Sequence, residues 1–245
     1  MFSYDVMPLG DKAIRVEIGK TISPEINSRV HRLASAFSTL KMKGVIELVP
    51  AYTTLTIYYN PLMISYLHLI DEIENQMNTL KSPAYLERKK VIIPVCYGGE
   101  KGPDLDYVAN YHAITCEKVI EMHTKRNYLT YMVGFLPGFP YLGGMNKQLA
   151  TPRKTKPRRS VAAGSVGIAG EQTGIYPIQS PGGWQIIGRT PVSLFNPTIK
   201  DPTLVKAGDY LVFKAVSETE YDTIKKAWEK GEYSPAILHE RVDDL

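Results

Sequence analysis

Apolar residues recur at helical spacing in two stretches within the first 80 residues. Such spacing places the apolar side chains on one face of a helix, which then packs against a core. The first stretch holds Ile26, Val30, Leu33, Phe37 and Leu40, and the second holds Ile64, Leu67, Ile73, Met77 and Leu80. Ser23-Pro24 predicts the start of the first helix, because a hydroxyl N-cap followed by proline favours a first turn. Ser82-Pro83 predicts the end of the second helix.

Short runs of β-branched and aromatic residues flank these helices and predict strands. The predicted strands are Tyr4–Pro8, Ala13–Ile18, Val45–Val49, Thr53–Tyr59 and Lys90–Val95. The order of strands and helices, ending on Lys90–Val95, is typical of a ferredoxin-like split βαβ fold. Polar residues at 81–89 predict a boundary, which gives a small α/β domain over 1–88 and a second domain over 89–245.

The second domain begins with two short predicted helices, Asp104–Tyr111 and Thr115–Lys125. Residues 134–191 then contain eleven glycines and seven prolines, which helices do not tolerate. This segment therefore predicts turns and short strands, as in a compact barrel or sandwich, and the whole chain is of the α+β class. Gly183–Phe195 and Asp209–Val216 are the clearest strands, and Ser217 with Glu220 predicts a capping box before a C-terminal helix.

The composition is that of a soluble globular protein, with 44% hydrophobic and 22% charged residues among 245. Two cysteines exclude a disulfide-rich scaffold, and the N-terminus has no secretory signal. Residues 128–146 carry no charge, but their glycines and prolines argue against a membrane helix. We therefore expect a cytoplasmic protein with no membrane partner.

The net charge of +4 is distributed unevenly, because residues 122–200 contain ten basic residues and one acidic residue. This imbalance favours a positive surface for an anionic ligand or an acidic partner. An equally good explanation of the imbalance is that a few of these arginines donate hydrogen bonds to loop carbonyls. The basic residues of 153–159 are interrupted by proline, and no nucleic-acid-binding motif accompanies them, so we expect no nucleic-acid partner.

Standard catalytic signatures are absent from the sequence. It contains no Walker A loop, no dinucleotide-binding fingerprint and no nucleophile elbow, and its five histidines never fall at metal-ligand spacing. We therefore expect no metal site built by this chain alone. His123 is a candidate because it directly precedes the glycine-rich region, although a histidine at a helix C-terminus also interacts with the helix dipole.

The glycine-rich region has three dense blocks, Gly134–Gly144, Ala163–Pro177 and Ser180–Pro191. Their glycines permit positive φ and close backbone approach, and turns of this kind can expose amides to an anion. Trp184 is either part of the core or a wall of a site, and Arg189 is either a ligand-binding or a structural residue.

These three blocks, with the upstream segments Ile93–Gly99 and Gly102–Asp106, closely resemble the KipI / allophanate hydrolase subunit 1 family. The resemblance covers about residues 4–216. It implies a cyclophilin-like β-barrel for the second domain, which describes a fold and not a prolyl isomerase.

The resemblance implies three possible roles. The first is the B subunit of an ATP-dependent 5-oxoprolinase, which cleaves 5-oxoproline to glutamate with partner subunits A and C. The second is inhibition of a sporulation histidine kinase, and the third is the related part of urea-degrading enzymes. The first is the most general role of the family, and we expect this chain to be inactive alone.

The site candidates are chosen by their chemistry within the glycine-rich region. Arg153 and Arg189 are candidate anion clamps, Ser165, Gln172 and Ser180 are candidate polar donors, and His123 is added by its position. Glu171 is the one carboxylate of this region, so we expect partner chains to bind most of the ATP and its magnesium ion. The apolar segment Phe135–Met145 is expected to face a partner subunit.

Overall fold

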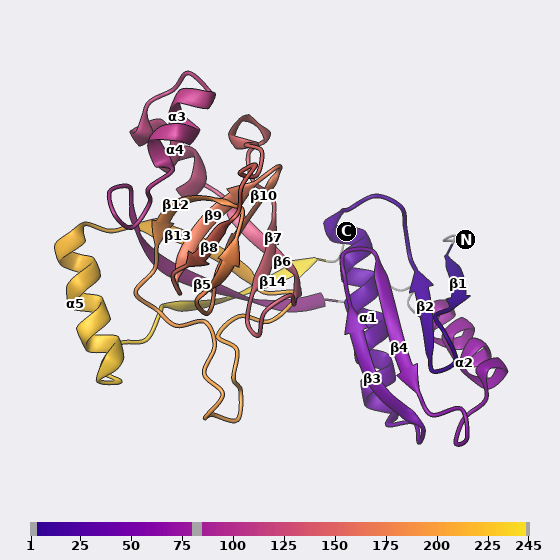
Figure 1. Ribbon diagram of the computed structural model, residues 1–245. Coiled ribbons are helices and arrows are strands. Elements are labelled where there is room, and N and C mark those ends of the chain that lie inside the picture. The colour runs from indigo at the N-terminus through magenta and orange to yellow at the C-terminus, as the bar shows by residue number, and fades with distance from the viewer. Residues whose placement is uncertain (1–3, 80–84, 244–245) are drawn as a thin grey trace. The chain divides into compact units, whose positions relative to one another are not determined.

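A computed structural model describes residues 4–79 and 85–243 of the chain. The chain divides into two compact units (Figure 1). Of the described residues, the first unit contains 4–79, 85–87 and 241–243, and the second unit contains 88–240. The predicted boundary after residue 88 lies one residue from this division.

The first unit is an antiparallel sheet whose strands lie in the order β1-β2-β4-β3. The strands are β1 (Asp5–Pro8), β2 (Ala13–Glu17), β3 (Val45–Pro50) and β4 (Thr54–Tyr59), and the helices are α1 (Pro24–Leu40) and α2 (Tyr66–Thr79). Ser23 caps α1, since its hydroxyl accepts a hydrogen bond from the Ile26 amide. The apolar face of each helix packs against the sheet to form one core.

One detail of the predicted second helix differs in the structure. Leu69, not Leu67, lies on the buried face, and Leu67 is 71% exposed. The buried residues Leu69, Ile73 and Met77 follow one another at intervals of four, which keeps them on one side of the helix. The predicted helix end at Ser82-Pro83 lies outside the described residues.

The predicted strand Lys90–Val95 belongs to the second unit and not to the first sheet, which corrects the expected strand order. It forms part of β5 (Tyr85–Tyr97), which pairs in parallel with β13 (Tyr210–Ala215). Beside β2, the edge of the first sheet is occupied by β1. The short turn at Gly10 makes this hairpin pairing local, and closing a short loop costs little entropy.

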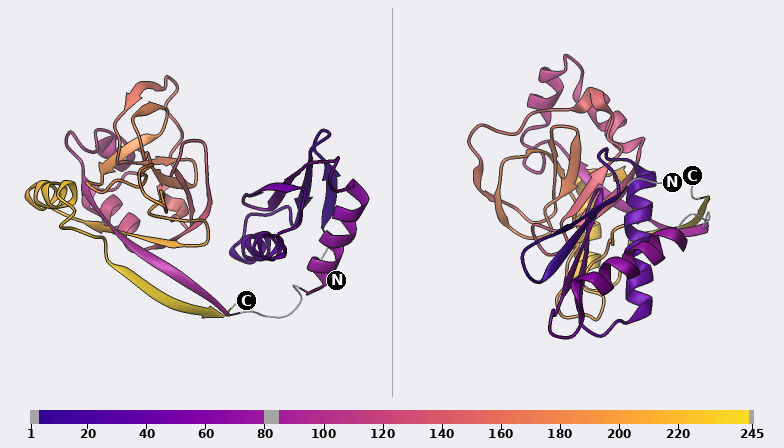
Figure 2. Two further views of the ribbon diagram at one scale, coloured as in Figure 1. Left: turned by 90° about the horizontal axis from the view of Figure 1, so that it is seen from below. Right: turned by 90° about the vertical axis from the view of Figure 1, so that its right-hand side faces the viewer.

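Seven strands of the described second unit close into a barrel, in the order β12-β9-β10-β7-β6-β13-β5 with β5 pairing back to β12. Besides β5 and β13, they are β6 (Asn127–Val133), β7 (Pro140–Gly143), β9 (Ser165–Ala169), β10 (Gln172–Ile175) and β12 (Gln185–Arg189). A further strand, β14 (Ile237–Asp243), lies alongside β5 (Figure 2). The predicted α+β class, with a barrel following a separate sheet, is confirmed.

Helices and one ribbon surround the barrel. The helices α3 (Leu105–Tyr111) and α4 (Cys116–Thr124) lie together at one end (Figure 1), and a 3-10 turn η1 spans Lys147–Leu149. The strands β8 (Arg158–Val161) and β11 (Ser180–Gly182) form a separate two-stranded ribbon.

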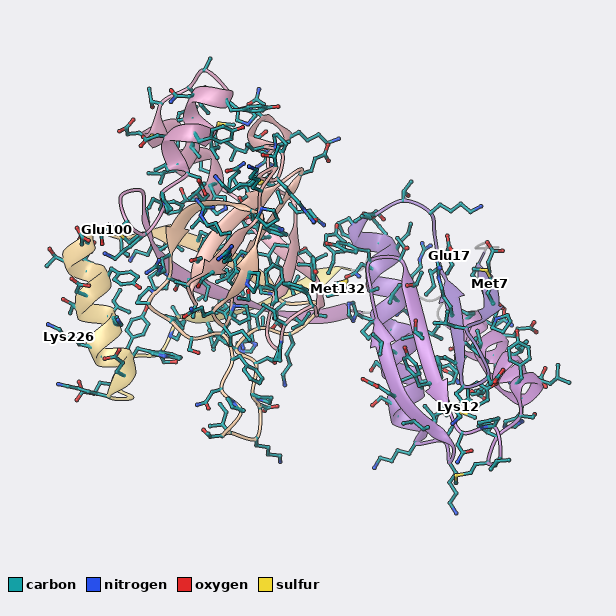
Figure 3. All side chains as sticks on the ribbon, viewed as in Figure 1. Met7, Lys12, Glu17, Glu100, Met132 and Lys226 are labelled. Carbon is teal, nitrogen blue, oxygen red and sulfur yellow. The ribbon has the colours of Figure 1, made fainter. Side chains whose placement is uncertain are left out.

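The C-terminal helix α5 (Glu218–Glu229) begins with the predicted capping box, in which Ser217 and Glu220 bond to each other's backbone amides. Its Tyr221 is buried, whereas Lys226 lies on the side turned away from the barrel (Figure 3). The helix is therefore amphipathic, as its sequence indicates.

The barrel is filled by a large apolar cluster that includes Val91, Ile93, Tyr128 and Phe213. Leu142 and Met145 belong to this cluster, and Phe139 is 1% exposed. Phe139, Leu142 and Met145 of the apolar segment Phe135–Met145 are therefore core residues rather than partner surface, whereas Leu136 and Tyr141 are partly buried and Phe135 is 68% exposed. Within the described residues, no helix combines the length and apolar character needed to cross a membrane.

Candidate functional site

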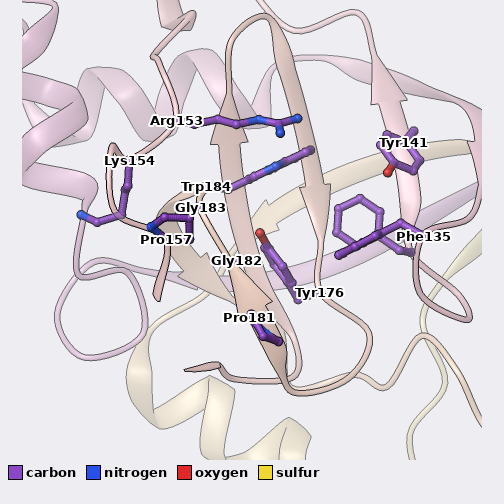
Figure 4. Close-up of a pocket in the computed structure, with 11 residues that line it drawn as sticks. Phe135, Tyr141, Arg153, Lys154, Pro157, Tyr176, Pro181, Gly182, Gly183 and Trp184 are labelled. Carbon is purple, nitrogen blue, oxygen red and sulfur yellow. The ribbon is translucent and has the colours of Figure 1, made fainter. Parts of the chain in front are cut away.

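A pocket of about 220 Å³ opens where the glycine-rich blocks meet the basic segment 153–158 (Figure 4). Its walls are formed by Phe135, Phe139, Tyr141, Arg153, Lys154, Pro157, Tyr176, Pro181, Gly182, Gly183 and Trp184. Lys154 lies on the opposite side of the pocket from Phe135 and Tyr141. The pocket thus has a basic side and an aromatic side.

The aromatic side is rigid because its rings pack edge to face. The ring centroid of Phe139 is 5.5 Å from that of Trp184 and 5.4 Å from that of Tyr176, with interplanar angles of 88° and 86°. Such T-shaped pairs are the favoured geometry of aromatic rings. Phe139, Tyr176 and Trp184 also belong to a small buried cluster with β8, β9 and β12. Trp184 is therefore a core residue and a pocket wall at the same time.

Glycines in these blocks leave room for the aromatic rings. An added Cβ at Gly182 would overlap the Tyr176 hydroxyl, and one at Gly174 would lie 3.1 Å from Trp184 Cζ3 and 3.2 Å from Phe139 Cζ. None of these three rings can move away without a cost in packing, because each packs against the other two. The sequence indicated close backbone approach to an unknown group. At Gly174 and Gly182 this group includes rings of the aromatic cluster, whereas Gly164 and Gly188 approach the carbonyls of Thr190 and Cys96.

The basic side is organised by Asp104, whose side chain is 6% exposed. Its Oδ1 accepts hydrogen bonds from Arg158 Nη2 at 2.7 Å and from Lys154 Nζ at 3.2 Å. Its Oδ2 accepts one from the Ile186 amide at 2.6 Å. Asp104 stands at the N-cap position of α3 but makes no side-chain cap bond there, because its carboxylate is directed to β12 instead.

These contacts keep Asp104 ionised. Burial by itself raises the pKa of the carboxyl group, but the hydrogen bonds from Arg158, Ile186 and Lys154 outweigh it, so its pKa is lowered. The carboxylate in turn neutralises part of the charge of Lys154 and Arg158. Arg153 is exposed and makes no hydrogen bond or ion pair with any residue that the structure describes, so it presents an uncompensated cation to the pocket.

Phe135 stands at the mouth of the pocket in an unusual conformation. Its φ is 69°, in the left-handed region that side-chain-bearing residues rarely adopt. The ring contacts Phe139 edge to face, with the centroids 5.8 Å apart. Strained residues of this kind are concentrated at ligand-binding sites.

The structure brings some of the predicted site residues to the pocket and leaves others elsewhere. Arg153 lines the pocket, and Ser180 precedes Pro181, which lines it. The Ser180 hydroxyl is buried without a hydrogen-bond partner in the structure. Gln172 is half-buried at the start of β10, opposite Ala169 of β9, and is not a lining residue.

Arg189 and Ser165 lie together but outside this pocket. They are direct partners in the register of β12 and β9, and neither is a lining residue. The Nε atom of Arg189 is buried with no hydrogen-bond partner. Burial raises the pKa of Tyr221 on α5, and the positive charge of Arg189 opposes part of this rise. The two predicted anion clamps, Arg153 and Arg189, are therefore separate.

His123 is fully buried in the barrel. Its Nδ1 lies 2.8 Å from the Tyr97 hydroxyl and its Nε2 lies 2.9 Å from Thr173 Oγ1. Burial lowers the pKa of the imidazole to about 3, so it is uncharged at neutral pH. Both ring nitrogens bond to side chains inside the barrel, rather than to the last carbonyls of α4 or to the pocket.

Sequence reasoning missed Asp104 as a site residue, although the segment Gly102–Asp106 was one of the family motifs. A signal was present, because a segment with ten basic residues and one acidic residue can form most of its ion pairs only with carboxylates from elsewhere in the chain. Among the described residues, His, Cys, Asp and Glu side chains nowhere gather in a group of three or more suited to a metal ion.

Two comparisons with known proteins match this chain over most of its length. The family model of the carboxyltransferase domain, subdomains C and D, matches residues 4–205. The B subunit of 5-oxoprolinase from Bacillus subtilis (strain 168) is 44% identical over 234 residues, which cover 91% of this chain and 97% of that protein.

Solved structures show the same fold within longer chains. One crystal structure is 36% identical and superposes with a TM-score of 0.75, over 84% of this chain and 40% of that chain. The urea amidolyase of K. lactis superposes with a TM-score of 0.82 over 98% of this chain and 16% of that chain. At 20% identity this second likeness is evidence of the fold alone.

Proposed function

Because this chain belongs to the carboxyltransferase domain family of subdomains C and D, and resembles the B subunit of a 5-oxoprolinase along nearly its whole length, we propose that it is itself the B subunit of an ATP-dependent 5-oxoprolinase. The family identified from the sequence motifs is thereby confirmed. The observation that carries the proposal is the similarity to a named B subunit over both units of the chain.

In the proposed reaction the chain acts together with subunits A and C. The complex opens the lactam of 5-oxoproline with water to give glutamate, and ATP hydrolysis drives the step. An amide is a poor electrophile, so the reaction needs cations and hydrogen-bond donors around the reacting carbonyl or around a transferring phosphoryl group. The basic, aromatic-walled pocket is the feature of this chain that is suited to such a task. Use of ATP is consistent with a cytoplasmic complex.

The pocket residues do not fit ATP with magnesium. None of the residues that line the pocket is a carboxylate, and Asp104 is already bound to two cations and an amide. A volume of about 220 Å³ is also below the range of roughly 300–1,000 Å³ that holds drug-sized ligands. The proposal therefore assigns the nucleotide and its metal ion to the partner subunits.

Reconstitution tests the proposal. We expect the purified chain alone to hydrolyse neither ATP nor 5-oxoproline, and a mixture with subunits A and C to release glutamate only when ATP is present. Mixtures lacking one subunit are the controls. Equal glutamate release with and without this chain would refute the proposal. Inhibition of histidine kinase autophosphorylation by the chain, with no glutamate release from the full mixture, would support the regulatory role instead.

A further inference from the structure

We infer that the pocket bounded by Arg153, Tyr176 and Trp184 is the binding site of the small cyclic acid itself, with the carboxylate of 5-oxoproline on Arg153 and the lactam ring against the aromatic wall. The inference rests on the proposed function, and it assigns to the B subunit the recognition of the substrate rather than of the nucleotide.

The charges around the pocket favour a single carboxylate. Lys154 and Arg158 share the buried Asp104 carboxylate, which accepts one hydrogen bond from each and offsets one of their two positive charges. Arg153 has no such partner among the described residues and lies on the pocket wall. A guanidinium binds a carboxylate through two parallel hydrogen bonds, so one free arginine is sufficient to hold and orient one acid group.

The size of the pocket favours a ligand of one small ring. A volume of about 220 Å³ equals that of roughly seven water molecules. A five-membered lactam with one carboxylate is of this size, whereas a nucleotide is much larger. The pocket therefore matches the substrate in size better than it matches a nucleotide.

The wall chemistry favours a flat ring with methylene groups. Phe139 and Tyr176 are 1% and 2% exposed, so they support the wall from behind and their positions are set by the protein. The aromatic surface that a ligand can touch belongs to Trp184, which is 6% exposed, to half-buried Tyr141 and to exposed Phe135. Preformed apolar walls with a few convergent polar groups are the usual design of small-molecule sites. Contact with these walls would remove water from one face of the lactam ring, and electrostatic interactions with its carbonyl are stronger where water is excluded.

The test is a steady-state comparison in the reconstituted complex of this chain with subunits A and C. Arg153→Ala is expected to raise the KM for 5-oxoproline by about ten- to a hundred-fold, which is the usual effect of losing one charge-assisted contact, and to leave the KM for ATP within about two-fold. Arg153→Lys is expected to restore binding only partly, because an ammonium cannot form the paired contact.

Arg159→Ala is the matched control, since Arg159 is an exposed arginine of the same basic segment that does not line the pocket. It is expected to change the KM for 5-oxoproline by less than about two-fold. If Arg153→Ala leaves this KM at the wild-type value, or changes it no more than Arg159→Ala does, the inference is wrong while the proposed function stands.

A titration of the isolated chain separates failure of the site from failure of the function. If the wild-type mixture releases no glutamate, the proposed function fails, and calorimetric titration with 5-oxoproline and with 2-pyrrolidinone, the same ring without the carboxylate, decides the inference. Binding of 5-oxoproline that Arg153→Ala weakens, with 2-pyrrolidinone unaffected, supports the site. Absence of 5-oxoproline binding in that case overturns it.

Discussion

At the scale of single residues, the hydrogen bonds around His123 determine which of its nitrogens carries the proton. The Thr173 hydroxyl donates its own hydrogen to the carbonyl of Gly167 at 3.0 Å, so it must accept from His123 Nε2. Nδ1 then accepts from the Tyr97 hydroxyl. The ring is a neutral Nε2–H tautomer with both nitrogens satisfied, which makes it a structural crosslink in the barrel.

This buried imidazole predicts a stability that depends on pH. The unfolded chain binds a proton at His123 near pH 6.5, whereas the folded chain does so only near its pKa of about 3. The unfolded state therefore binds more protons in this window, and the free energy of unfolding falls as pH is lowered through it. Between pH 7 and pH 5 we expect His123 to account for a loss of about 2 kcal/mol.

Urea titrations of wild type and His123→Gln at the two pH values measure this contribution, since the glutamine does not titrate. Equal losses of stability in the two proteins would contradict it. Nitrogen-15 chemical shifts of the ring report the tautomer independently, and protonation of Nδ1 at neutral pH would show the assignment to be wrong.

At the scale of elements, the turn between β6 and β7 holds Phe135 in a conformation that its burial does not explain. The residue has φ 69° and is 68% exposed. Burial of its ring therefore contributes little stabilisation to offset the backbone strain. Phe135 lines the pocket, and in this backbone conformation its ring contacts Phe139.

A pair of substitutions at Phe135 tests the strain. Phe135→Ala and Phe135→Gly both remove the ring, but only glycine adopts positive φ without cost. We expect the glycine variant to be more stable than the alanine variant by about 1 kcal/mol in denaturant titrations, the reverse of the usual order in helices and strands. A more stable alanine variant would show that the turn relaxes and carries no strain.

At the scale of the whole molecule, Asp104 connects parts of the chain that are distant in sequence. Its partners Lys154, Arg158 and Ile186 are 50, 54 and 82 residues away. One buried carboxylate therefore joins the start of α3, the basic segment and β12, and it fixes the basic side of the pocket relative to the aromatic side.

Removal of this charge is expected to destabilise the protein strongly. Asp104→Asn leaves two partly buried cations without their carboxylate, and breaking a buried ion pair typically costs about 3 kcal/mol. Glu121→Gln is the matched control, because Glu121 also pairs with two lysines, Lys118 and Lys125, but on the exposed surface of α4. Its expected cost in thermal or denaturant unfolding is below about 1 kcal/mol. Equal losses of unfolding free energy for the two substitutions would show that burial of the Asp104 ion pairs adds nothing to stability.

Much of the local structure followed from the sequence, because its causes are local. Three features depend only on neighbouring residues, and each appears in the structure. They are the N-cap at Ser23, the capping box at Ser217, and the turns and short strands of the glycine-rich segment. Arg153, chosen from the sequence as an anion clamp, lines the pocket, and its role there stays a prediction. The assignment of Lys90–Val95 failed because a buried strand has the same apolar pattern whichever sheet it joins.

The sequence by itself thus determined the helices, most of the strands, the class of the fold and the family, since propensity, periodicity and motifs act over a few residues. Only the tertiary structure decided that β5 closes the barrel, that His123 is internal, and that Arg153 and Arg189 are apart. It also decided that Asp104 pairs with Lys154 and Arg158 and offsets part of their charge, while Arg153 has no ion-pair partner among the described residues. The physical reason is that burial and charge pairing depend on which distant segments come into contact, and the spacing of residues along the chain does not specify those contacts.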